Sequence, residues 1–424
     1  MAAGGAPKNI VIIGGGVIGL CTAYYALRRG HRVTVLERGA PDHDGCSLGN
    51  AGMIVPSHFV PLAAPGMVGL GLRLLLRPGA PFAIRPRPDP DLLRWCWLFR
   101  RAANAGHVAR SAPLLRDLHL ASRRLFEELA EERGNDFGLQ KRGLLMLCKS
   151  ARAFREEAHL AETARSLGLA ADVLTAEAAA RLDPGLRMEI AGAVYFPQDC
   201  HLSPPHFLAG LTRTLEREGA TLRWCTEATG WRTAGDGGIE AVRTDHGDVP
   251  GDEFVLAGGA WSAALLRPLG VRLPLEAGKG YSFTLSHPKR LPALCSILTE
   301  ARVAVTPMGA ALRFAGTLEI GGRDRSIHRA RVRNLLRAIP GYFPEFTADD
   351  FAGLPVWSGL RPCSPDGLPY VGRFARFENL CVATGHAMLG VSLGPVTGRL
   401  VAEIVSGDTP SFDIAALRPD RYAG

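Results

Sequence analysis

The sequence predicts an α/β protein of two domains, one with a doubly wound parallel sheet and one of α+β type built on a mostly antiparallel sheet. Three observations lead to this prediction. A strand–glycine turn–helix–strand unit opens the chain, two later strands also run into glycine-rich turns, and a long stretch before residue 352 carries short strands with few helices. The length of 424 residues is also too great for one ordinary hydrophobic core.

The opening unit has the periodicities of a β-α-β element. Ile10–Ile13 is a short β-branched run that glycine ends, as expected of a buried strand. From Val17 to Arg29 the apolar spacing is helical, and Gly30 stands where a C-terminal glycine cap belongs. A second strand is predicted at Arg32–Leu36.

The turn inside this unit predicts a dinucleotide site. Gly14, Gly16 and Gly19 have G-x-G-x-x-G spacing. In this motif the first glycine allows a tight turn, the second allows the backbone to approach a pyrophosphate, and the third allows the helix to pack closely on the strand. The amino end of the following helix offers free N–H groups and a positive dipole to phosphates. Glu37 follows at the offset where a carboxylate accepts a hydrogen bond from ribose.

Two later segments repeat the pattern of a strand that ends in glycines. Phe254–Ala257 runs into Gly258–Ser262, and Leu380–Ala383 runs into a loop followed by a helix from Gly394 to Val405. The carboxyl ends of parallel strands are where such sheets present their backbone to ligands. We therefore expect a discontinuous cofactor domain of residues 1–56, 191–270 and 353–424, with residues 57–190 and 271–352 forming the substrate domain.

The substrate domain is predicted from shorter elements. Strands are expected at Gly143–Lys149, Tyr281–Leu285, Val303–Pro307 and Leu312–Ala315, whereas a strand at Gly192–Phe196 is expected within the cofactor domain. Helices are expected over most of 91–133, over 152–167, and over 323–339. The Pro- and Arg-rich stretch 78–90 predicts a connector, and 358–369 predicts a turn-rich segment.

Composition narrows the class of protein. The net charge of +8 is modest for this length, and no basic–aromatic cluster indicates nucleic-acid binding. Nine scattered cysteines without a C-x-x-C motif or metal-ligand spacing favour free thiols in a reducing compartment and no metal site. The first residues lack signal-peptide organisation, so a cytoplasmic location is expected.

One apolar stretch bears on membranes. Residues 47–72 contain no charged side chain, but three prolines would break a spanning helix. The following Met67–Arg77 stretch fits either a helix packed within the protein or a peripheral contact with the inner face of the cytoplasmic membrane. The sequence does not decide the role of this stretch. It also does not decide whether the protein is a monomer or a homo-oligomer.

Several longer motifs resemble the FAD-dependent D-amino-acid oxidase superfamily, which has a glutathione-reductase-like Rossmann FAD domain. They are VIIGGGVIGL with Glu37, SLGNAGMI, AAPG, VLAGGAWS, GKGYS, RFAGTLEI, GLRPCSPDGLPYVG and ATGHAMLGVSLGPVTG. The resemblance is nearest to bacterial D-amino-acid dehydrogenases of the small-subunit type. After SLGNAGM this chain carries Ser57–Leu62 where broad-specificity members tend to carry aromatic residues, which resembles the branch that oxidises D-hydroxyproline.

The resemblance implies noncovalent FAD and a set of contacts. Gly14, Gly16 and Gly19 would hold the pyrophosphate and Glu37 the ribose, while Cys363 does not match the tethering cysteine of relatives. The implied cofactor-binding residues are Gly14, Gly16, Val17, Ile18, Gly19, Glu37, Arg38, Ser47, Asn50, Ala51, Gly52, Met53, Ala228, Gly258, Trp261, Arg361, Gly385, His386, Met388, Leu389 and Gly390.

The resemblance also implies the reaction, in which hydride leaves the substrate α-carbon for flavin N5. Such a transfer requires the substrate carboxylate to be held, and the planar fork of Arg361 suits it. Tyr281 is the expected second contact, His58 is expected to gate substrate access, and His386 is expected to lie against the flavin. The positive end of the last helix is expected to stabilise charge on the reduced ring.

We therefore expect an FAD-dependent dehydrogenase of a free D-amino acid, with D-proline or cis-4-hydroxy-D-proline favoured. The electron acceptor is expected to be a quinone or respiratory carrier rather than NAD. One alternative is a glycine or sarcosine oxidase-like amine oxidase that uses oxygen, and another is an FAD-carrying electron-transfer subunit of a multi-chain complex. The substrate, the acceptor and the choice between oxidase and dehydrogenase do not follow from the sequence.

Overall fold

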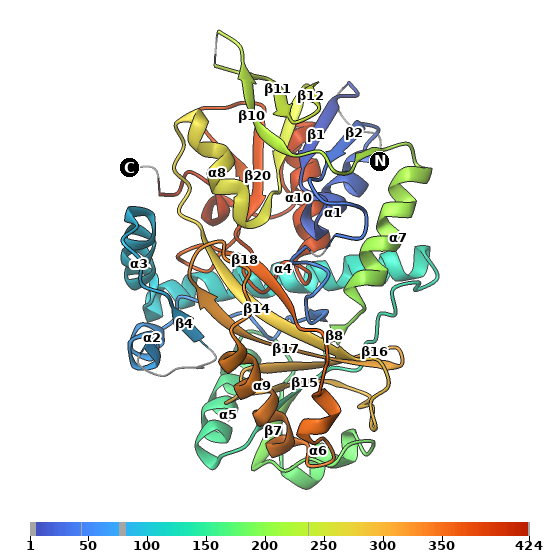
Figure 1. The fold of residues 1–424 in the computed structure, drawn as a ribbon, viewed down its shortest axis with the longest axis vertical. Coiled ribbons are helices and arrows are strands. Elements are labelled where there is room, and N and C mark those ends of the chain that lie inside the picture. Colours follow the sequence, from blue (N-terminus) through green and yellow to red (C-terminus); the bar gives the residue numbers. More distant parts are fainter. Residues whose placement is uncertain (1–5, 44, 76–81, 236, 423–424) are drawn as a thin grey trace.

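The two main sheets of the protein lie one above the other, with one long helix between them (Figure 1). The computed structural model describes residues 6–43, 45–75, 82–235 and 237–422. The smaller sheet contains β1 and lies in the upper half of the figure, and the larger sheet contains β14 and lies below. Helix α4 (Ala105–Glu132) runs between them.

The smaller sheet is the predicted doubly wound sheet, with strand order β19-β20-β13-β1-β2-β9. All its pairs are parallel except β19–β20. It places the three predicted glycine-terminated strands side by side at its centre. The strands are β1 (Asn9–Ile13), β2 (Arg32–Leu36), β9 (Thr221–Arg223), β13 (Glu253–Leu256), β19 (Tyr370–Arg373) and β20 (Leu380–Thr384).

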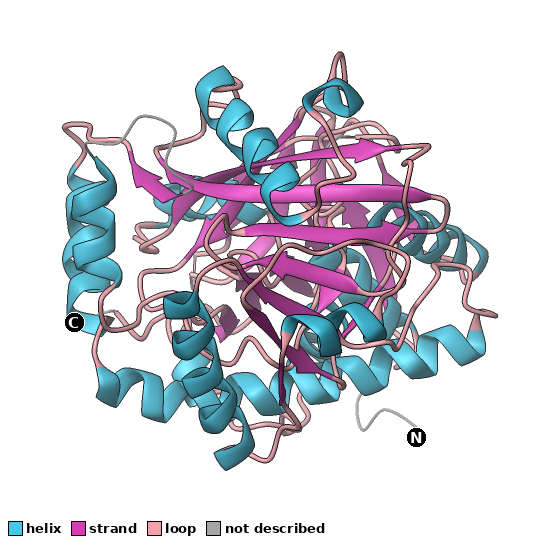
Figure 2. Cartoon of the chain, turned by 90° about the horizontal axis from the view of Figure 1, so that it is seen from below, coloured by secondary structure: helices cyan, strands magenta, loops and turns pink. Residues whose placement is uncertain are grey.

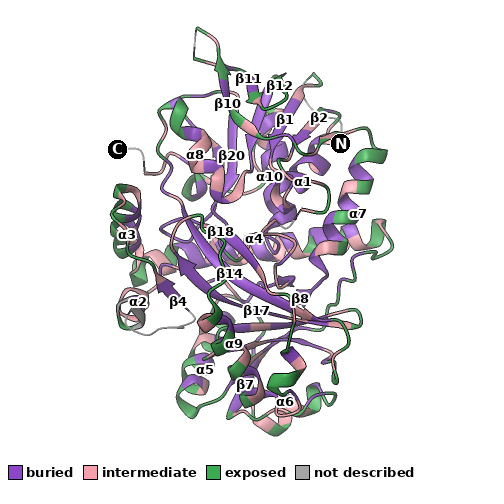
Figure 3. Cartoon of the chain, in the orientation of Figure 1, coloured by how far each residue is buried: buried purple, intermediate pink, exposed green. Residues whose placement is uncertain are grey.

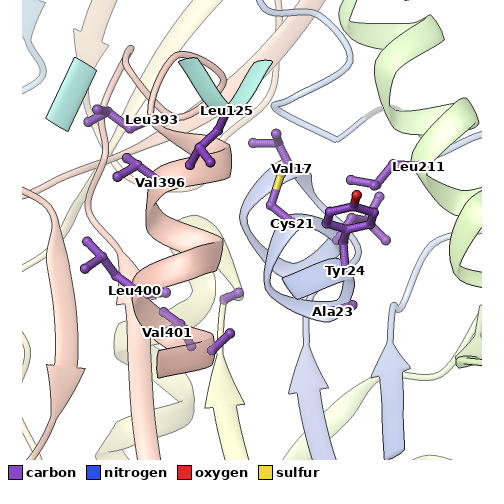
Figure 4. Packing of buried hydrophobic residues seen from close by; sticks show 14 of the residues in the cluster. Val17, Cys21, Ala23, Tyr24, Leu125, Leu211, Leu393, Val396, Leu400 and Val401 are labelled. Atoms are coloured by element: carbon purple, nitrogen blue, oxygen red, sulfur yellow. The ribbon is translucent and has the colours of Figure 1, made fainter. Parts of the chain in front are cut away.

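One face of this sheet is covered by helices from four separate parts of the chain. These are α1 (Val17–Leu27), α7 (Pro204–Arg217) and α10 (Gly394–Ser406), together with α4. Helices α1 and α10 cross closely because Gly398 leaves no side chain at the crossing, where a Cβ would lie 2.5 Å from the Cys21 carbonyl carbon. Figure 4 shows the resulting apolar contacts between the two helices.

The other face carries a small antiparallel sheet and a short helix. The sheet comprises β10 (Ala228–Thr233), β11 (Ile239–Thr244) and β12 (Gly247–Pro250), and the helix is α8 (Ser262–Leu266). With helices on one face and these elements on the other, the parallel strands are buried on both sides, in agreement with their continuous apolar sequences (Figure 3).

The larger sheet has nine strands and is mostly antiparallel, as predicted. Its order is β18-β14-β17-β16-β15-β5-β7-β6, and β4 pairs with β17. Only the β15–β5 and β17–β4 pairs are parallel among the described strands. The strands are β4 (Phe82–Ile84), β5 (Leu144–Cys148), β6 (Asp172–Leu174), β7 (Gly192–Phe196), β14 (Glu276–Leu285), β15 (Cys295–Leu298), β16 (Val303–Met308), β17 (Ala311–Ile320) and β18 (Trp357–Cys363).

Helices lie around this sheet (Figure 2). They are α2 (Met67–Leu75), α3 (Pro90–Ala102), α5 (Ala151–Ser166), α6 (Ala176–Leu182) and α9 (Arg329–Tyr342). Helices α9 and α5 pack their buried residues against the strands of the sheet. A two-stranded ribbon of β3 (Met53–Ile54) and β8 (Cys200–His201) lies outside both sheets. No helix in the described ranges is both long and apolar enough to cross a membrane.

Several sequence-based boundaries need correction. Strands β7 and β18 belong to the larger sheet, so the expected domain boundaries at residues 191 and 353 lie on the wrong side of these strands. The connector 78–90 contains β4, whose residues pair with β17, and the turn-rich stretch 358–369 begins as β18. In each case long-range strand pairing overrides local turn propensity.

The helix predicted over 323–339 begins at Arg329, because the preceding residues form a loop. Of the predicted apolar stretch Met67–Arg77, residues 67–75 form α2, and residues 76 and 77 lie outside the described residues.

Candidate functional site

A cavity of about 550 Å³ opens at the carboxyl edge of the parallel sheet. One end is formed by residues after β2 and β13, and the other by β18 and the loop after β20. The cavity therefore extends from the glycine turn to the larger sheet. It brings together strand ends that lie far apart in the sequence, as we expected from the three glycine-terminated strands.

The glycine turn lies against the strand β13 and excludes side chains. Gly14 has a φ of +112°, and a Cβ there would lie 2.5 Å from the Ala257 carbonyl oxygen. A Cβ on Gly19 would lie 1.9 Å from the Gly14 carbonyl oxygen, so this glycine allows α1 to approach the turn. Gly14 and Gly16 line the cavity, whereas Gly19 supports it from behind.

The amino end of α1 points its donors toward this part of the cavity. Val17 and Ile18 line the wall, and the Val17 N–H donates to the Ser47 hydroxyl at 3.1 Å. Ser47 is thus a neutral partner at the place where a phosphate oxygen would accept from the helix. This arrangement suits a pyrophosphate.

Glu37 is fixed by the backbone at the neighbouring end of the cavity. Its carboxylate accepts from the Gly15 N–H at 2.7 Å and from the Gly39 N–H at 2.8 Å. Each carboxylate oxygen can accept a further hydrogen bond, so Glu37 retains acceptor sites for a ribose hydroxyl. The two backbone bonds orient it for that contact.

A cation–π pair of Arg38 and Trp261 forms the cavity wall near Glu37. The Arg38 guanidinium carbon lies 3.7 Å from the centroid of the Trp261 ring. Both residues line the cavity with Ala228 and Gly258, and their contact with adenine stays a prediction. His43 and Thr226, which the sequence did not single out, line it as well.

The loop after β2 is held by an arginine that sequence reasoning missed. Arg313 of β17 donates from one nitrogen to the Leu48 and Asn50 carbonyl oxygens, both at 2.8 Å. The Asn50 side chain accepts from the Gly52 N–H and donates to the Met388 carbonyl oxygen, which joins this loop to the loop after β20. Burial lowers the pKa of Arg313 to about 10.

The loop after β20 forms the wall opposite the glycine turn. His386 lies on this wall and is buried, and its Nε2 is 3.0 Å from the Thr397 hydroxyl in the first turn of α10. Burial lowers its pKa to about 3, so the imidazole is neutral. Its Nδ1 has no hydrogen-bond partner among the described residues and is available to a bound group.

Arg361 lies behind this wall on β18. Leu360 and Pro362 face the cavity, so the alternation of the strand directs Arg361 to the opposite face. There its guanidinium covers Gly280 and donates to the Thr317 carbonyl oxygen at 2.5 Å. Burial lowers its pKa, and no carboxylate pairs with it among the described residues.

Tyr281 does not share this face, and the expected pairing with Arg361 is wrong. Arg361 is opposite Gly278 in the β14–β18 register, and Tyr281 is an odd number of residues further along β14, on the other face. Its side chain is fully buried, and its hydroxyl accepts from the His328 N–H at 3.1 Å. Tyr281 therefore stabilises the start of α9.

The remaining predicted residues separate into two groups. The cavity is lined by Gly14, Gly16, Val17, Ile18, Glu37, Arg38, Ser47, Asn50, Ala228, Gly258, Trp261, His386 and Gly390. The cavity wall does not include Gly19, Ala51, Gly52, Met53, His58, Tyr281, Arg361, Gly385, Met388 or Leu389. Gly52 instead allows close approach of the Leu202 backbone, Met53 is in β3, and the Met388 side chain is 40% exposed.

Cys363 is a poor candidate for a covalent link. Its thiol is fully buried in an apolar cluster, and burial raises its pKa to about 12. Cys46 lies on the cavity wall instead, and burial raises the pKa of that thiol too. Both side chains are therefore thiols, which react poorly.

Comparisons with known proteins identify the cofactor of this cavity. The profile of the "FAD dependent oxidoreductase" family matches residues 9–404. The chain belongs to this family. The cavity fits FAD, because a glycine turn, the amino end of α1 and a backbone-fixed carboxylate have the chemistry to hold a pyrophosphate and a ribose.

Two relatives are similar over nearly their full length. A D-amino acid dehydrogenase of Granulibacter bethesdensis is 33% identical, covering 98% of this chain and all of the relative. One of Rhizorhabdus wittichii is 34% identical with the same coverage. Among solved structures, a glycine oxidase from Geobacillus kaustophilus is 27% identical with a TM-score of 0.78, covering 99% of this chain and 100% of that chain.

Proposed function

We propose that this FAD-dependent oxidoreductase dehydrogenates a free D-amino acid, with D-proline or cis-4-hydroxy-D-proline favoured. The observation that carries the proposal is Arg361, a guanidinium without a carboxylate partner among the described residues, beside the loop that closes the cavity. A charged group in such surroundings requires an anion, and an amino-acid carboxylate matches its planar fork. The names of the two dehydrogenase relatives support this substrate class.

We propose that different residues bind the cofactor and the substrate. The glycine turn, Glu37 and Arg38 would hold the adenosine diphosphate part of FAD, and the 386–391 loop would border the flavin. When bound, FAD supplies the oxidising chemistry, which is the acceptance of a hydride at flavin N5. Arg361 would hold the carboxylate so that one face of the α-carbon is presented.

A compact cyclic substrate is favoured by the segment before α2. The only aromatic ring of a phenylalanine, tyrosine or tryptophan in Ser57–Leu62 is that of Phe59, which is fully buried. The segment is held in place, because a Cβ on Gly367 would lie 2.6 Å from the Leu62 backbone nitrogen. This segment carries His58, whose partly exposed imidazole is proposed to lie beside the substrate.

The alternatives predict different electron acceptors. An oxidase would return electrons to oxygen, as the glycine oxidase neighbour suggests, whereas we propose a quinone or respiratory carrier. A carrier subunit would react with no free amino acid.

Steady-state kcat/KM should be higher for cis-4-hydroxy-D-proline and D-proline than for D-alanine, glycine and sarcosine, with ubiquinone analogues as acceptors. Equal preference, or fast hydrogen peroxide formation, would contradict the proposal.

We further propose that α3 touches an anionic membrane surface, where a quinone would be reached. Leu93 and Trp97 lie on one helix face with 66% and 54% of their surfaces exposed. Arg94, Arg100 and Arg101 are exposed around them, and an exposed aromatic side chain among arginines suits a bilayer interface.

Sedimentation with vesicles tests this contact. The protein should bind vesicles containing anionic lipid, and Trp97→Glu should weaken binding at least several-fold. Leu182→Glu is the matched control, because Leu182 is also an exposed apolar residue but lies on α6. Equal binding by both variants, or no binding by the unaltered protein, would contradict a role for α3.

A further inference from the structure

A chain of three hydrogen-bonded side chains leads from the buried Asp199 and Ser57 to the partly exposed His58, in the segment before α2. The Ser57 hydroxyl is hydrogen bonded to the Asp199 carboxylate and lies 3.0 Å from His58 Nδ1. The Ser57 N–H also donates to Asp199, at 3.1 Å. We propose that Asp199, Ser57 and His58 form a proton relay that accepts the proton of the substrate amine.

The position of the chain connects it to the site. Val55 donates its N–H to the Ser392 hydroxyl at 3.0 Å, next to Val391 on the cavity wall. Ala63, at the other end of the segment, packs in one apolar cluster with Ala387 and Cys363. His58 therefore lies in the segment 55–63, which contacts the 386–392 loop at Val55 and packs at Ala63 against the face of β18 that carries Arg361.

Asp199 is an unusual carboxyl group for a core. It is fully buried and has no ion-pair partner among the described residues. Burial raises its pKa to about 7, and the bonds from Ser57 and the nearby Arg123 lower it to a smaller extent. The thiols of Cys200 and Cys295 are further titratable neighbours of Asp199, and burial keeps both protonated. His58 has His119 as a titratable neighbour, and burial lowers the pKa of His119 to about 3, so that imidazole stays neutral.

The charge state of Asp199 determines which nitrogen of His58 carries the proton. Ionised Asp199 accepts a hydrogen bond from the Ser57 hydroxyl, so the Ser57 oxygen accepts from Nδ1–H and Nε2 is left as an acceptor. Protonated Asp199 donates to Ser57, Ser57 donates to Nδ1, and Nε2 carries the hydrogen. The serine reverses its direction between the two states.

This reversal makes a base that never becomes cationic. A substrate ammonium gives its proton to Nε2, the Nδ1 proton moves to the Ser57 oxygen, and the Ser57 proton moves to Asp199. One N–H bond of the ammonium is broken and one O–H bond is formed on Asp199, with His58 neutral before and after. Burial lowers the pKa of His58 to about 4, so a relay that avoids the imidazolium is favoured.

The relay deepens the proposed function, because it assumes that the amine of the substrate lies beside His58. The neutral amine is the form that can lose hydride, so an ammonium must be deprotonated first. Arg361 would bind the carboxylate, and His58 would accept from the nitrogen. In this account His58 contacts the substrate, while Ser57 and Asp199 act through it.

The first test is the tautomer of His58, measured by nitrogen NMR of histidine-labelled protein and assigned with His58→Gln. It should change from Nε2–H to Nδ1–H as the pH rises through about 7. Asp199→Asn should keep the Nε2–H form at every pH, because the amide donates to Ser57 as the protonated acid does. A tautomer that is insensitive to pH or to Asp199→Asn would overturn the relay, whichever substrate the enzyme uses.

The second test is the pH dependence of anaerobic flavin reduction by the best amine substrate. Asp199→Asn should slow reduction about 100-fold near neutral pH, and the deficit should shrink as the pH approaches the pKa of the free amine. Ser57→Ala should behave alike. Glu157→Gln, the matched control, removes another buried carboxyl and should leave the profile unchanged. An equal loss at every pH would indicate a merely structural role and overturn the proposal.

Discussion

Replacing Arg361 with alanine should lower kcat/KM for the amino-acid substrate by about 10²- to 10³-fold while FAD stays bound. The reason is that truncating one partner of a buried charge pair costs roughly 2–5 kcal/mol. The guanidinium donates only to the Thr317 carbonyl oxygen within the described structure, and it points away from the cavity. The loss should therefore fall on the substrate carboxylate and leave the cofactor in place.

The matched comparison is Arg313, another partly buried arginine without a carboxylate partner in the described structure. Arg313→Ala removes the two hydrogen bonds to the Leu48 and Asn50 carbonyl oxygens, so it should weaken FAD retention. A second control is the amide of the substrate, which lacks the carboxylate. Its low kcat/KM should be the same in the unaltered enzyme and in Arg361→Ala. Loss of FAD from Arg361→Ala, or unchanged kinetics, would remove Arg361 from the substrate site.

Replacing Glu157 with glutamine should stabilise the protein at alkaline pH. Glu157 lies in α5 with 8% of its surface exposed, and burial, with Glu156 and Glu300 nearby, raises its pKa to about 7. A folded pKa above the unfolded one means that stability from proton binding is present at acidic pH and is lost as the pH rises through about 7. The ionised form therefore costs up to roughly 3 kcal/mol near pH 8.

Thermal unfolding at two pH values measures this effect. Near pH 8, Glu157→Gln should raise Tm by several degrees, whereas near pH 5 the difference should be small. Glu156→Gln is the control, because the neighbouring side chain is exposed and should change Tm little at either pH. A gain for Glu157→Gln that is equal at both pH values would contradict the raised pKa.

The cofactor end of the site could be predicted from sequence because its information is local. Gly14, Gly16 and Glu37 lie within one β-α-β unit, so spacing alone determines how they meet. The two later glycine-terminated strands extended this prediction, since parallel strands must end at one edge. Each of these three residues lines the cavity as expected.

The substrate end depends on strand register, which the sequence does not reveal. Tyr281 and Arg361 lie on adjacent strands, but a shift of one residue decides whether they share a face. The alternate glycines Gly278 and Gly280 were the available signal, because they leave space on the face of Arg361. Arg313 and Asp199 could not be found from sequence, since their partners lie more than 140 residues away.

Anaerobic reduction of the purified yellow protein by the two enantiomers of proline tests the central claim most directly. The flavin should lose its colour on addition of D-proline or cis-4-hydroxy-D-proline, with L-proline much slower, and NADH should not substitute for them. Because this is a single turnover, no electron acceptor needs to be known. Colour loss with L-proline at the same rate, or with neither enantiomer, would contradict a D-amino-acid dehydrogenase of this type.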